Sequence, residues 1–242
     1  MSPFTIFDLV NMAVCGGGQP VFLDTGENSP HLTLETIRQS VDEQTALVVV
    51  THYHTINPEI EEIAEFLKTR DIALLEDCAI SLGARLNNQH VGTFGDYGLF
   101  SFGLFKFIAT YFGGCAWVRD IEVLKKIEAE TNEWPKMKAR DLSPYVRKGL
   151  KFSLATNPLL FNIVTFPLFR HGYVNDVEWI KRNAVNDPNP ELKTELPESY
   201  KRRPSDYQQR DWARQLPNVL KARIDRLDRA REYARCFAGS NV

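Results

Sequence analysis

The chain carries the stretch ALLEDCAISLGA at residues 73–84, followed by the stretch FSFGLFK at residues 100–106. The apolar run Ala73–Asp77 is typical of a buried strand that ends on a polar position, and Gly98–Phe102 predicts a second strand. Ligands of open α/β sheets bind beyond the carboxyl ends of strands, so Asp77 is placed where a site would be. Glu76 is expected to point to the opposite face of the sheet.

Further strands are predicted outward from this stretch, at Pro20–Asp24, Ala46–Val50 and Gly114–Val118. Asn57 and Pro58 open a helix whose apolar residues recur at helical spacing, which indicates the crossover of a βαβ unit. The alternation predicts an α/β fold, a mostly parallel sheet with helices on both faces. The connection 103–113 is short for a helical crossover, so the last two strands are expected to be antiparallel, with Lys106 between them.

Beyond the sheet, an amphipathic helix is predicted over Asp120–Glu130 and another over Arg214–Phe237. The sequence between them is irregular and rich in proline. We therefore expect a main α/β body at residues 1–133, an irregular and helical insertion with an apolar segment at 134–204, and a helix-bearing segment at 205–242.

The composition is that of a globular protein, with 43% hydrophobic and 25% charged residues among 242 and a formal net charge of -2. That charge offers no large single-sign field to attract nucleic acid or an anionic membrane, so a small-molecule or protein partner is expected. Four cysteines lie far apart without a CxxC pair, so reduced thiols are expected rather than disulfides or zinc. No secretory signal is recognisable at the N-terminus, and the predicted location is cytoplasmic.

The segment 152–169 contains no charged residue and is flanked by Arg147, Lys148, Lys151 and Arg170. Two prolines and two asparagines disfavour a membrane-spanning helix, because their polar groups would stay unsatisfied in lipid. Two alternatives stay open, namely ordinary buried or interface helices and weak contact with a membrane surface.

Lys106 lies in an almost wholly apolar context, and a partly desolvated lysine is a better nucleophile toward a carbonyl. His52 and His54 share a face of an extended segment, but they lack a third ligand at a telling distance, so no metal site is expected. The chain has no GxGxxG motif, no P-loop and no nucleophile elbow, which excludes the dinucleotide, nucleotide-hydrolase and esterase classes.

Several blocks together resemble the DegT/DnrJ/EryC1/StrS sugar aminotransferase family. They are LLEDCAISLGA (74–84), VGTFGD (91–96), FSFGLFK (100–106) and GGCAWV (113–118), in the family's order and spacing. The resemblance extends to PVFLD (20–24), to THYH (51–54) and to SDYQ (205–208).

This resemblance implies the fold type I architecture of pyridoxal phosphate (PLP) enzymes, in which residues 1–133 hold the PLP-binding part. It implies a homodimer with the active site at the interface, and amino transfer to a keto sugar nucleotide, usually from glutamate, in sugar-nucleotide or polysaccharide biosynthesis. By the same resemblance Lys106 binds PLP covalently and later moves a proton, Asp77 pairs with the ring nitrogen, and Ser101 binds the phosphate.

The chain also differs from the family pattern at several places. Ile80 stands where Gln or His is usual, and Phe107 stands where Asn commonly follows the lysine. The family's first strand, its Gly-Thr phosphate turn and its small C-terminal domain have no counterpart here, so the chain is expected to be truncated at both ends. A catalytically silent homologue that keeps a dimeric binding or regulatory scaffold is the alternative. A dehydration chemistry fits less well, because relatives of that kind replace the lysine with histidine.

Overall fold

The protein is described here by a computed structural model that covers residues 1–242 apart from 28, 54, 179, 181–190 and 239–242. The chain divides into two compact units. Unit 1 comprises Met1–Thr5, Pro20–Lys136 and Lys201–Val242, and it contains the sheet. Unit 2 comprises Ile6–Gln19 and Met137–Tyr200 and is largely helical.

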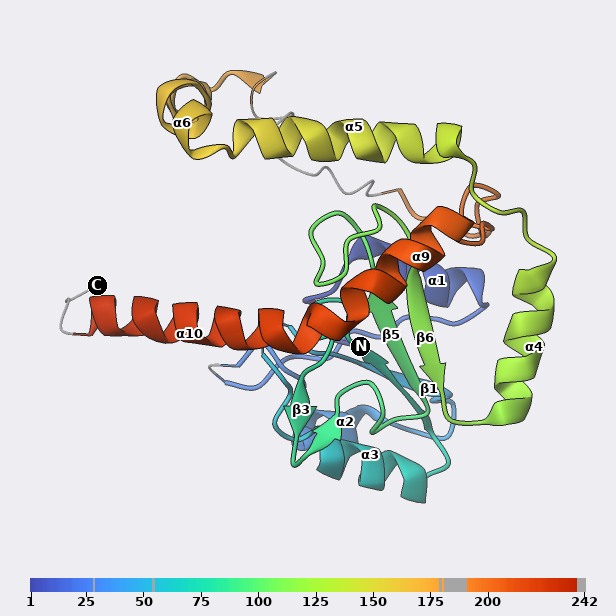
Figure 1. The fold of residues 1–242 in the computed structure, drawn as a ribbon. Helices are drawn as coiled ribbons and strands as arrows, with labels where there is room; N and C mark the ends of the chain where they lie inside the picture. Colours follow the sequence, from blue (N-terminus) through green and yellow to red (C-terminus); the bar gives the residue numbers. More distant parts are fainter. Residues whose placement is uncertain (28, 54, 179, 181–190, 239–242) are drawn as a thin grey trace. The chain divides into compact units, whose positions relative to one another are not determined.

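A four-stranded sheet forms the centre of unit 1, in the order β1-β2-β5-β6 (Figure 1). Its strands are β1 (Leu47–Thr51), β2 (Ala73–Asp77), β5 (Tyr97–Ser101) and β6 (Gly114–Val118). The first three are parallel, and β6 runs antiparallel to β5. This confirms the predicted mostly parallel α/β sheet and its antiparallel last pair, with strand ends within one residue of those expected.

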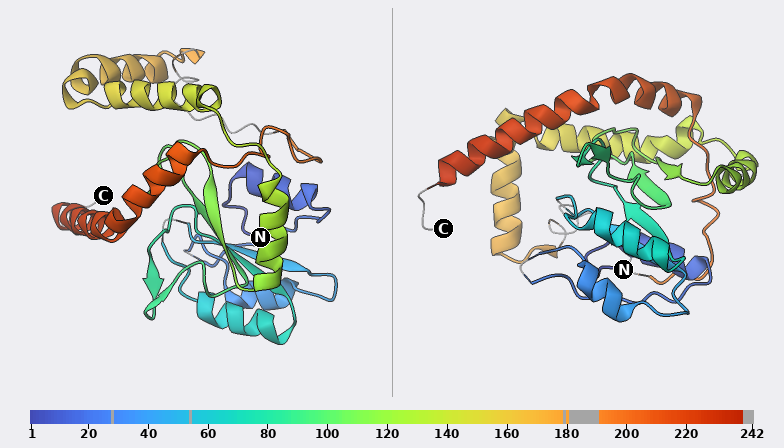
Figure 2. Two further views of the ribbon diagram at one scale, coloured as in Figure 1. Left: turned by 45° about the vertical axis from the view of Figure 1, so that its right-hand side comes forward. Right: turned by 90° about the horizontal axis from the view of Figure 1, so that it is seen from below.

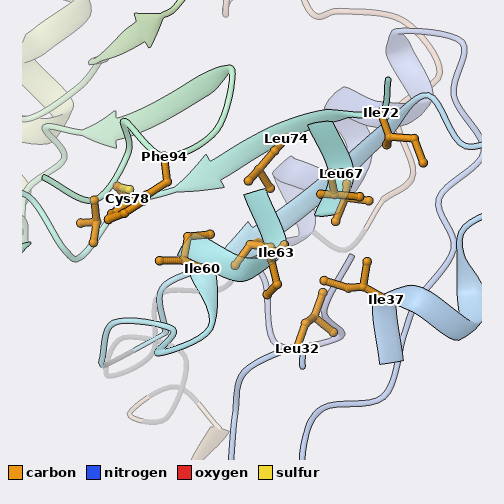
Figure 3. Close-up of a cluster of buried hydrophobic side chains, with 12 residues drawn as sticks. Leu32, Ile37, Ile60, Ile63, Leu67, Ile72, Leu74, Cys78 and Phe94 are labelled. Carbon is orange, nitrogen blue, oxygen red and sulfur yellow. The ribbon is translucent and has the colours of Figure 1, made fainter. Parts of the chain in front are cut away.

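Two helices, α2 (Leu34–Ser40) and α3 (Ile60–Thr69), pack on one face of the sheet, and both views of Figure 2 place them on the same side. The helix α3 is the predicted crossover from β1 to β2. Its residues Ile60, Ile63 and Leu67 recur at helical spacing and are at most 1% exposed. They join apolar residues of the strands and of α2 in one buried cluster (Figure 3). Burying each such side chain stabilises the fold by about 1.5–3 kcal/mol.

The C-terminal part of unit 1 consists of α9 (Asp206–Gln215), a 3-10 turn (Leu216–Asn218) and α10 (Val219–Phe237). Trp212 of α9 stacks on Phe102 with ring centroids 6.1 Å apart, next to buried Ile108 and Val219. The prediction of one helix over Arg214–Phe237 was wrong at its start. Pro217 lacks a backbone N–H, and the chain turns there in 3-10 geometry before α10 begins.

The predicted strand Pro20–Asp24 is absent from the sheet, and this is a correction. These residues belong to no helix or strand, and Val21 and Phe22 are 62% and 51% exposed. Their backbone bonds run to the first residue instead, since Met1 donates to the Val21 carbonyl at 2.8 Å and Leu23 donates to the Met1 carbonyl at 3.0 Å. An apolar run without a paired strand does not form a ladder.

Unit 1 also contains a helix after β6 and a short two-stranded hairpin. The predicted helix after β6 is α4 (Ile121–Asn132), and Asp120 caps it by accepting from the N–H groups of Glu122 and Val123. A short hairpin joins β3 (Arg85–Leu86) to β4 (Gln89–His90), with Asn87 and Asn88 both at positive φ.

Unit 2 contains α1 (Phe7–Cys15), α5 (Ala139–Ala155), α6 (Pro158–Leu160), the π-helical turn Phe161–Thr165 and α7 (Phe166–Val174). Fully buried Asn11 of α1 pairs with the backbone of Glu191 and Lys193. No single helix in the described part of the chain is long and apolar enough to cross a membrane. The pair Ala139–Ala155 and Pro158–Val174, bent by 65°, has that length and composition together.

Candidate active site

Each of the three parallel strands ends in a polar residue at its carboxyl end. Thr51, Asp77 and Ser101 are the last residues of β1, β2 and β5. Thr51 is the register partner of Asp77, and Asp77 that of Leu99, which lies two residues before Ser101. Because side chains alternate along a strand, all three polar side chains belong to one face. This is the carboxyl edge at which open α/β sheets bind ligands.

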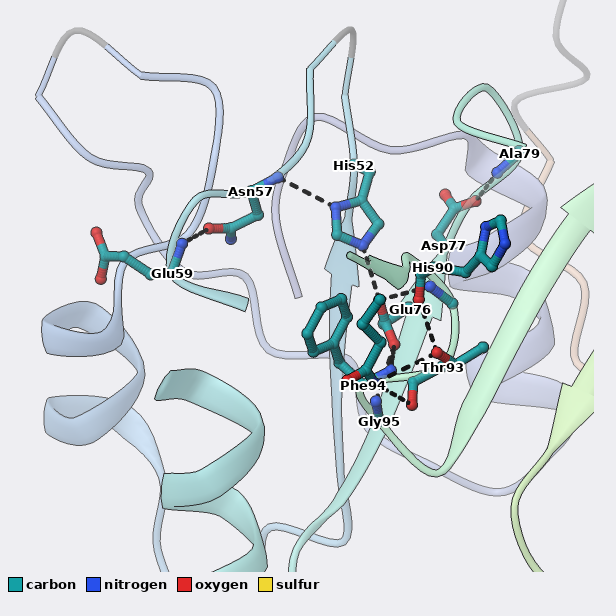
Figure 4. A network of polar contacts seen from close by, with 12 residues as sticks. His52, Asn57, Glu59, Glu76, Asp77, Ala79, His90, Thr93, Phe94 and Gly95 are labelled. Atoms are coloured by element: carbon teal, nitrogen blue, oxygen red, sulfur yellow. Dashed lines mark hydrogen bonds and ion pairs between the residues drawn. The ribbon is translucent and has the colours of Figure 1, made fainter. Parts of the chain in front are cut away.

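Asp77 is 8% exposed, and two donors hold its carboxylate in place. The Thr51 hydroxyl donates to Oδ2 at 3.4 Å. The Ala79 N–H donates to Oδ1 at 3.1 Å, as Figure 4 shows. A carboxylate offers about four lone-pair sites. Asp77 therefore keeps acceptor capacity for a further donor. Thr51 was not among the predicted site residues, although its place at the end of the neighbouring parallel strand would have indicated it.

Ser101 and Lys106 lie on either side of Gly103. A Cβ at Gly103 would have Ser101 Oγ at 3.7 Å and Lys106 Cγ at 3.8 Å. The Gly103 N–H donates to Ser101 Oγ at 3.4 Å, and the Lys106 N–H donates to the Gly103 carbonyl at 3.2 Å. Lys106 is half-buried, as its apolar context predicted. The turn after β5 thus holds the Ser101 hydroxyl and the base of the Lys106 side chain close to Gly103, just beyond the strand ends that include Asp77.

Glu76 points to the opposite face from Asp77, as predicted, and it is fully buried. Its Oε1 accepts from the N–H groups of Phe94 and Gly95, and its Oε2 accepts from Gly92 N–H and His52 Nε2 (Figure 4). All four of these hydrogen bonds are accepted by the two oxygens of Glu76, which matches the acceptor-only chemistry of a carboxylate. His52 Nδ1 accepts the Asn57 N–H at 3.1 Å, so the ring proton is on Nε2. The network fixes the segment 92–95 to the strand that carries Asp77.

His52, Glu76 and Cys78 come close enough to suggest metal ligands, since their ligand atoms lie within 4.8 Å of one another. However, both ring nitrogens of His52 and both oxygens of Glu76 already have hydrogen-bond partners. Burial and the neighbouring Glu76 carboxylate raise the pKa of the Cys78 thiol far above its usual range. A metal needs the thiolate, so these three residues form a structural core group. His54, the other histidine considered as a ligand, lies outside the described residues.

A groove of about 670 Å³ lies at the other end of the strands, lined by residues of α3, of the turn 71–74 and of the loop 94–97. Its Arg119 guanidinium is already bonded to the carbonyls of Thr93, Phe94 and Gly95. The amino ends of parallel strands are not where α/β sheets bind their ligands. The groove is therefore not a candidate for the active site.

Comparisons with known proteins agree with the predicted family. The family model described as the DegT/DnrJ/EryC1/StrS aminotransferase family matches residues 1–146. GDP-perosamine synthase of Escherichia coli O157:H7 is 32% identical over 111 residues, which cover 46% of this chain and 30% of that protein. The UDP-N-acetyl-3-dehydro-alpha-D-glucosamine 3-aminotransferase of Acidithiobacillus ferrooxidans is 28% identical over 53% of this chain and 35% of that protein.

Solved structures give the same fold. Helicobacter pylori PseC, an aminotransferase involved in the biosynthesis of pseudaminic acid, is 26% identical with a TM-score of 0.52 over 57% of this chain and 37% of its own. The GDP-4-keto-6-deoxy-D-mannose-3-dehydratase of E. coli, with bound hydrated PLP, has a TM-score of 0.62 at 20% identity over 99% of this chain and 52% of its own. The matched segments span about a third of the length of the curated relatives.

Proposed function

The chain belongs to the DegT/DnrJ/EryC1/StrS aminotransferase family, and from this premise we propose that it contributes the PLP-binding edge of an enzyme that transfers an amino group to a keto sugar nucleotide. The single observation that carries the proposal is the set of side chains at one sheet edge. The buried carboxylate of Asp77 and the hydroxyl of Ser101 end parallel strands on one face of the sheet, and Lys106 follows in the turn after β5. PLP is bound through three matching groups, which are its ring nitrogen, its phosphate and its aldehyde carbon.

Aminotransferases of this family use PLP, which supplies an electron-withdrawing ring beside a reactive carbonyl. Asp77 has the chemistry to accept the proton-bearing ring nitrogen, because its two present donors leave lone pairs free. Ser101 has the hydroxyl to donate to the phosphate. Lys106 would hold the cofactor covalently and, once displaced by the amino donor, would carry a proton to and from the substrate carbon that bears the nitrogen.

The substrate class follows from relatives whose names state nucleotide-linked sugars, such as GDP-perosamine and UDP-N-acetyl-3-dehydro-alpha-D-glucosamine. We infer a keto sugar nucleotide as the acceptor and glutamate as the donor, within sugar-nucleotide or polysaccharide biosynthesis in the cytoplasm. We also infer that two copies assemble as a homodimer, since the edge at Asp77 and Ser101 supplies contacts to only part of the cofactor.

The donor half of the reaction gives a direct test. The full chain is incubated with PLP and glutamate, and pyridoxamine phosphate and 2-oxoglutarate are measured by chromatography. The proposal expects both products in equal amounts, and it expects neither from Lys106→Ala. Lys126→Ala on the exposed surface of α4 is the matched control and should keep full conversion.

A silent scaffold is the second candidate, favoured by Ile80. This half-buried side chain follows Asp77 by three residues and offers no hydrogen-bonding group. If the chain is a silent scaffold, we expect a folded dimer in which neither the wild type nor Lys106→Ala forms pyridoxamine phosphate. Ile80→Gln separates the two candidates further. If this variant gained conversion of PLP to pyridoxamine phosphate, a hydrogen bond from residue 80 to the cofactor would be what the wild type lacks.

A further inference from the structure

The helices of unit 2 expose large apolar side chains along two consecutive helical stretches. Leu154 near the end of α5 is 62% exposed, Leu159 of α6 is 75% exposed, and Ile163 of the π-helical turn is 74% exposed. Phe166 and Val174 of α7 are also exposed, at 53% and 74%. Monomeric soluble proteins rarely expose apolar side chains in such a contiguous set. We call Ala139–Ala155 together with Pro158–Val174 the apolar hairpin.

The charge of the apolar hairpin has a single sign between Asp141 and Asp176. That interval contains Arg147, Lys148, Lys151 and Arg170, and it contains no acidic residue. Both Arg147 and Lys151 are exposed on the same helix that carries Leu150 and Leu154. Basic side chains beside exposed apolar ones are the pattern of a helix that lies at the surface of an anionic bilayer.

The geometry favours lying on a membrane over crossing it. The helix direction bends by 65° between the two arms of the apolar hairpin, which are the yellow and orange helices in the right-hand view of Figure 2. Pro158–Val174 is about 25 Å long at 1.5 Å per residue, which is less than the roughly 30 Å of a bilayer core. The other arm carries Arg147, Lys148 and Lys151 within its length. Neither arm alone is long and apolar enough to span, and the two arms together carry exposed apolar side chains and exposed basic ones.

We propose that the apolar hairpin docks this protein on an anionic lipid surface, with Leu159, Ile163 and Phe166 entering the acyl boundary and Arg147, Lys151 and Arg170 contacting lipid phosphates. A second copy of the chain fits this surface less well. An isologous contact would bring two sets of four cations together without an acidic residue from the same interval to pair with them. The inference is independent of the proposed catalytic function.

Sedimentation with vesicles tests the proposal on the full chain. Vesicles of phosphatidylglycerol mixed with phosphatidylcholine should bind the protein at least about tenfold more tightly than phosphatidylcholine alone, and high salt should remove that difference. The double variant Leu159→Glu/Ile163→Glu should lose binding to both kinds of vesicle. The charge variant Arg147→Gln/Lys151→Gln should lose only the preference for phosphatidylglycerol.

The matched control is Leu220→Glu/Ile224→Glu on α10, where the two side chains are similarly exposed at 54% and 58%. This control should sediment like the wild type. Circular dichroism establishes that each variant keeps its helices. Folded wild-type protein that stays in the supernatant with phosphatidylglycerol vesicles would overturn the proposal. So would a native mass that falls by half in Leu159→Glu/Ile163→Glu without vesicle binding by the wild type, because the hairpin would then be an interface between copies.

Discussion

His52 donates its Nε2 proton to Glu76 Oε2 over 3.0 Å, inside a core where neither side chain is exposed to solvent. Glu76 is the neighbour of Asp77 on β2, and its other oxygen binds the backbone at Phe94 and Gly95. Glu76, which stabilises the segment 92–95, and Asp77, which faces the candidate site, are therefore neighbours on β2 with side chains on opposite faces of the sheet. A change at Glu76 should act on stability, and a change at Asp77 should act on cofactor affinity.

Glu76→Gln should destabilise unit 1 by about 3 kcal/mol, measured as the free energy of unfolding in urea. The amide would present an NH₂ donor to backbone N–H donors that now bind a carboxylate oxygen, which leaves buried donors unsatisfied. Glu122→Gln is the control, because its ion pair with Lys125 is exposed at 68% and 62% and should be worth less than about 1 kcal/mol. Equal stability of the two variants would show that the Glu76 network is not what stabilises these loops.

Gly98→Ala should destabilise the sheet by about 2–3 kcal/mol, because a Cβ there would run into the backbone carbonyl of Gly92. Gly103→Ala is a matched substitution with its nearest neighbours at 3.7 and 3.8 Å, which is ordinary van der Waals contact. Its unfolding midpoint should stay close to that of the wild type. Chemical denaturation of both variants checks the difference, and a Gly98→Ala variant as stable as Gly103→Ala would refute the close approach.

Stability should fall as pH rises above about 9, in part through Cys78. Burial raises the pKa of this thiol in the folded state, whereas the unfolded thiol ionises near its ordinary value of 9.0. The stabilisation that the buried thiol contributes is complete below pH 9. It is lost as the pH rises above 9, because the unfolded chain then releases the thiol proton while the folded chain keeps it. The urea midpoint of Cys78→Ala should be lower near pH 7 but decline less steeply above pH 9. Parallel declines for the two proteins would mean that other groups account for the alkaline loss.

Asp77→Asn should weaken PLP binding by roughly 10–100-fold, because a charge-assisted hydrogen bond to the ring nitrogen is replaced by a neutral one. The thermal midpoint should change little, because the amide oxygen can still accept from the Ala79 N–H, and the Thr51 hydroxyl can rotate to accept from the amide nitrogen. A fluorescence titration with PLP measures the affinity, and Asp228→Asn on exposed α10 is the control. Unchanged affinity in Asp77→Asn would remove this residue from the proposed site.

The sheet was predictable because its strands are largely apolar runs bounded by polar residues or glycine. Ala73–Asp77 and Gly114–Val118 were located to the residue, and the short connection around Lys106 gave the antiparallel pair. The strand expected at Pro20–Asp24 did not form because local composition reports β preference, whereas a strand also needs a neighbouring strand. The backbone groups of Val21 and Leu23 bond to Met1 instead. The break at Pro217 shows the reverse case, in which one residue overrides a helical pattern.

The candidate site was predictable only in part. Asp77, Ser101 and Lys106 came from the blocks shared with the family, since a single aspartate or lysine has no distinctive pattern. The contacts of Thr51 with Asp77 and of His52 with Glu76 depend on the register between β1 and β2, which periodicity along one strand does not contain. The exposure of the apolar hairpin likewise depends on tertiary packing, although its charge pattern is visible in the sequence.

Whether Lys106 binds PLP is measured by adding PLP to the purified full chain, reducing with borohydride, and locating the modified residue by peptide mass spectrometry. We expect a near-visible absorption band before reduction and, after reduction, a single stable adduct on the peptide that contains Lys106. Lys106→Ala should show neither the band nor the adduct. Well-folded wild-type protein without a lysine-dependent band, or with adducts spread over surface lysines to the same extent in Lys106→Ala, would contradict the assignment and leave the scaffold reading.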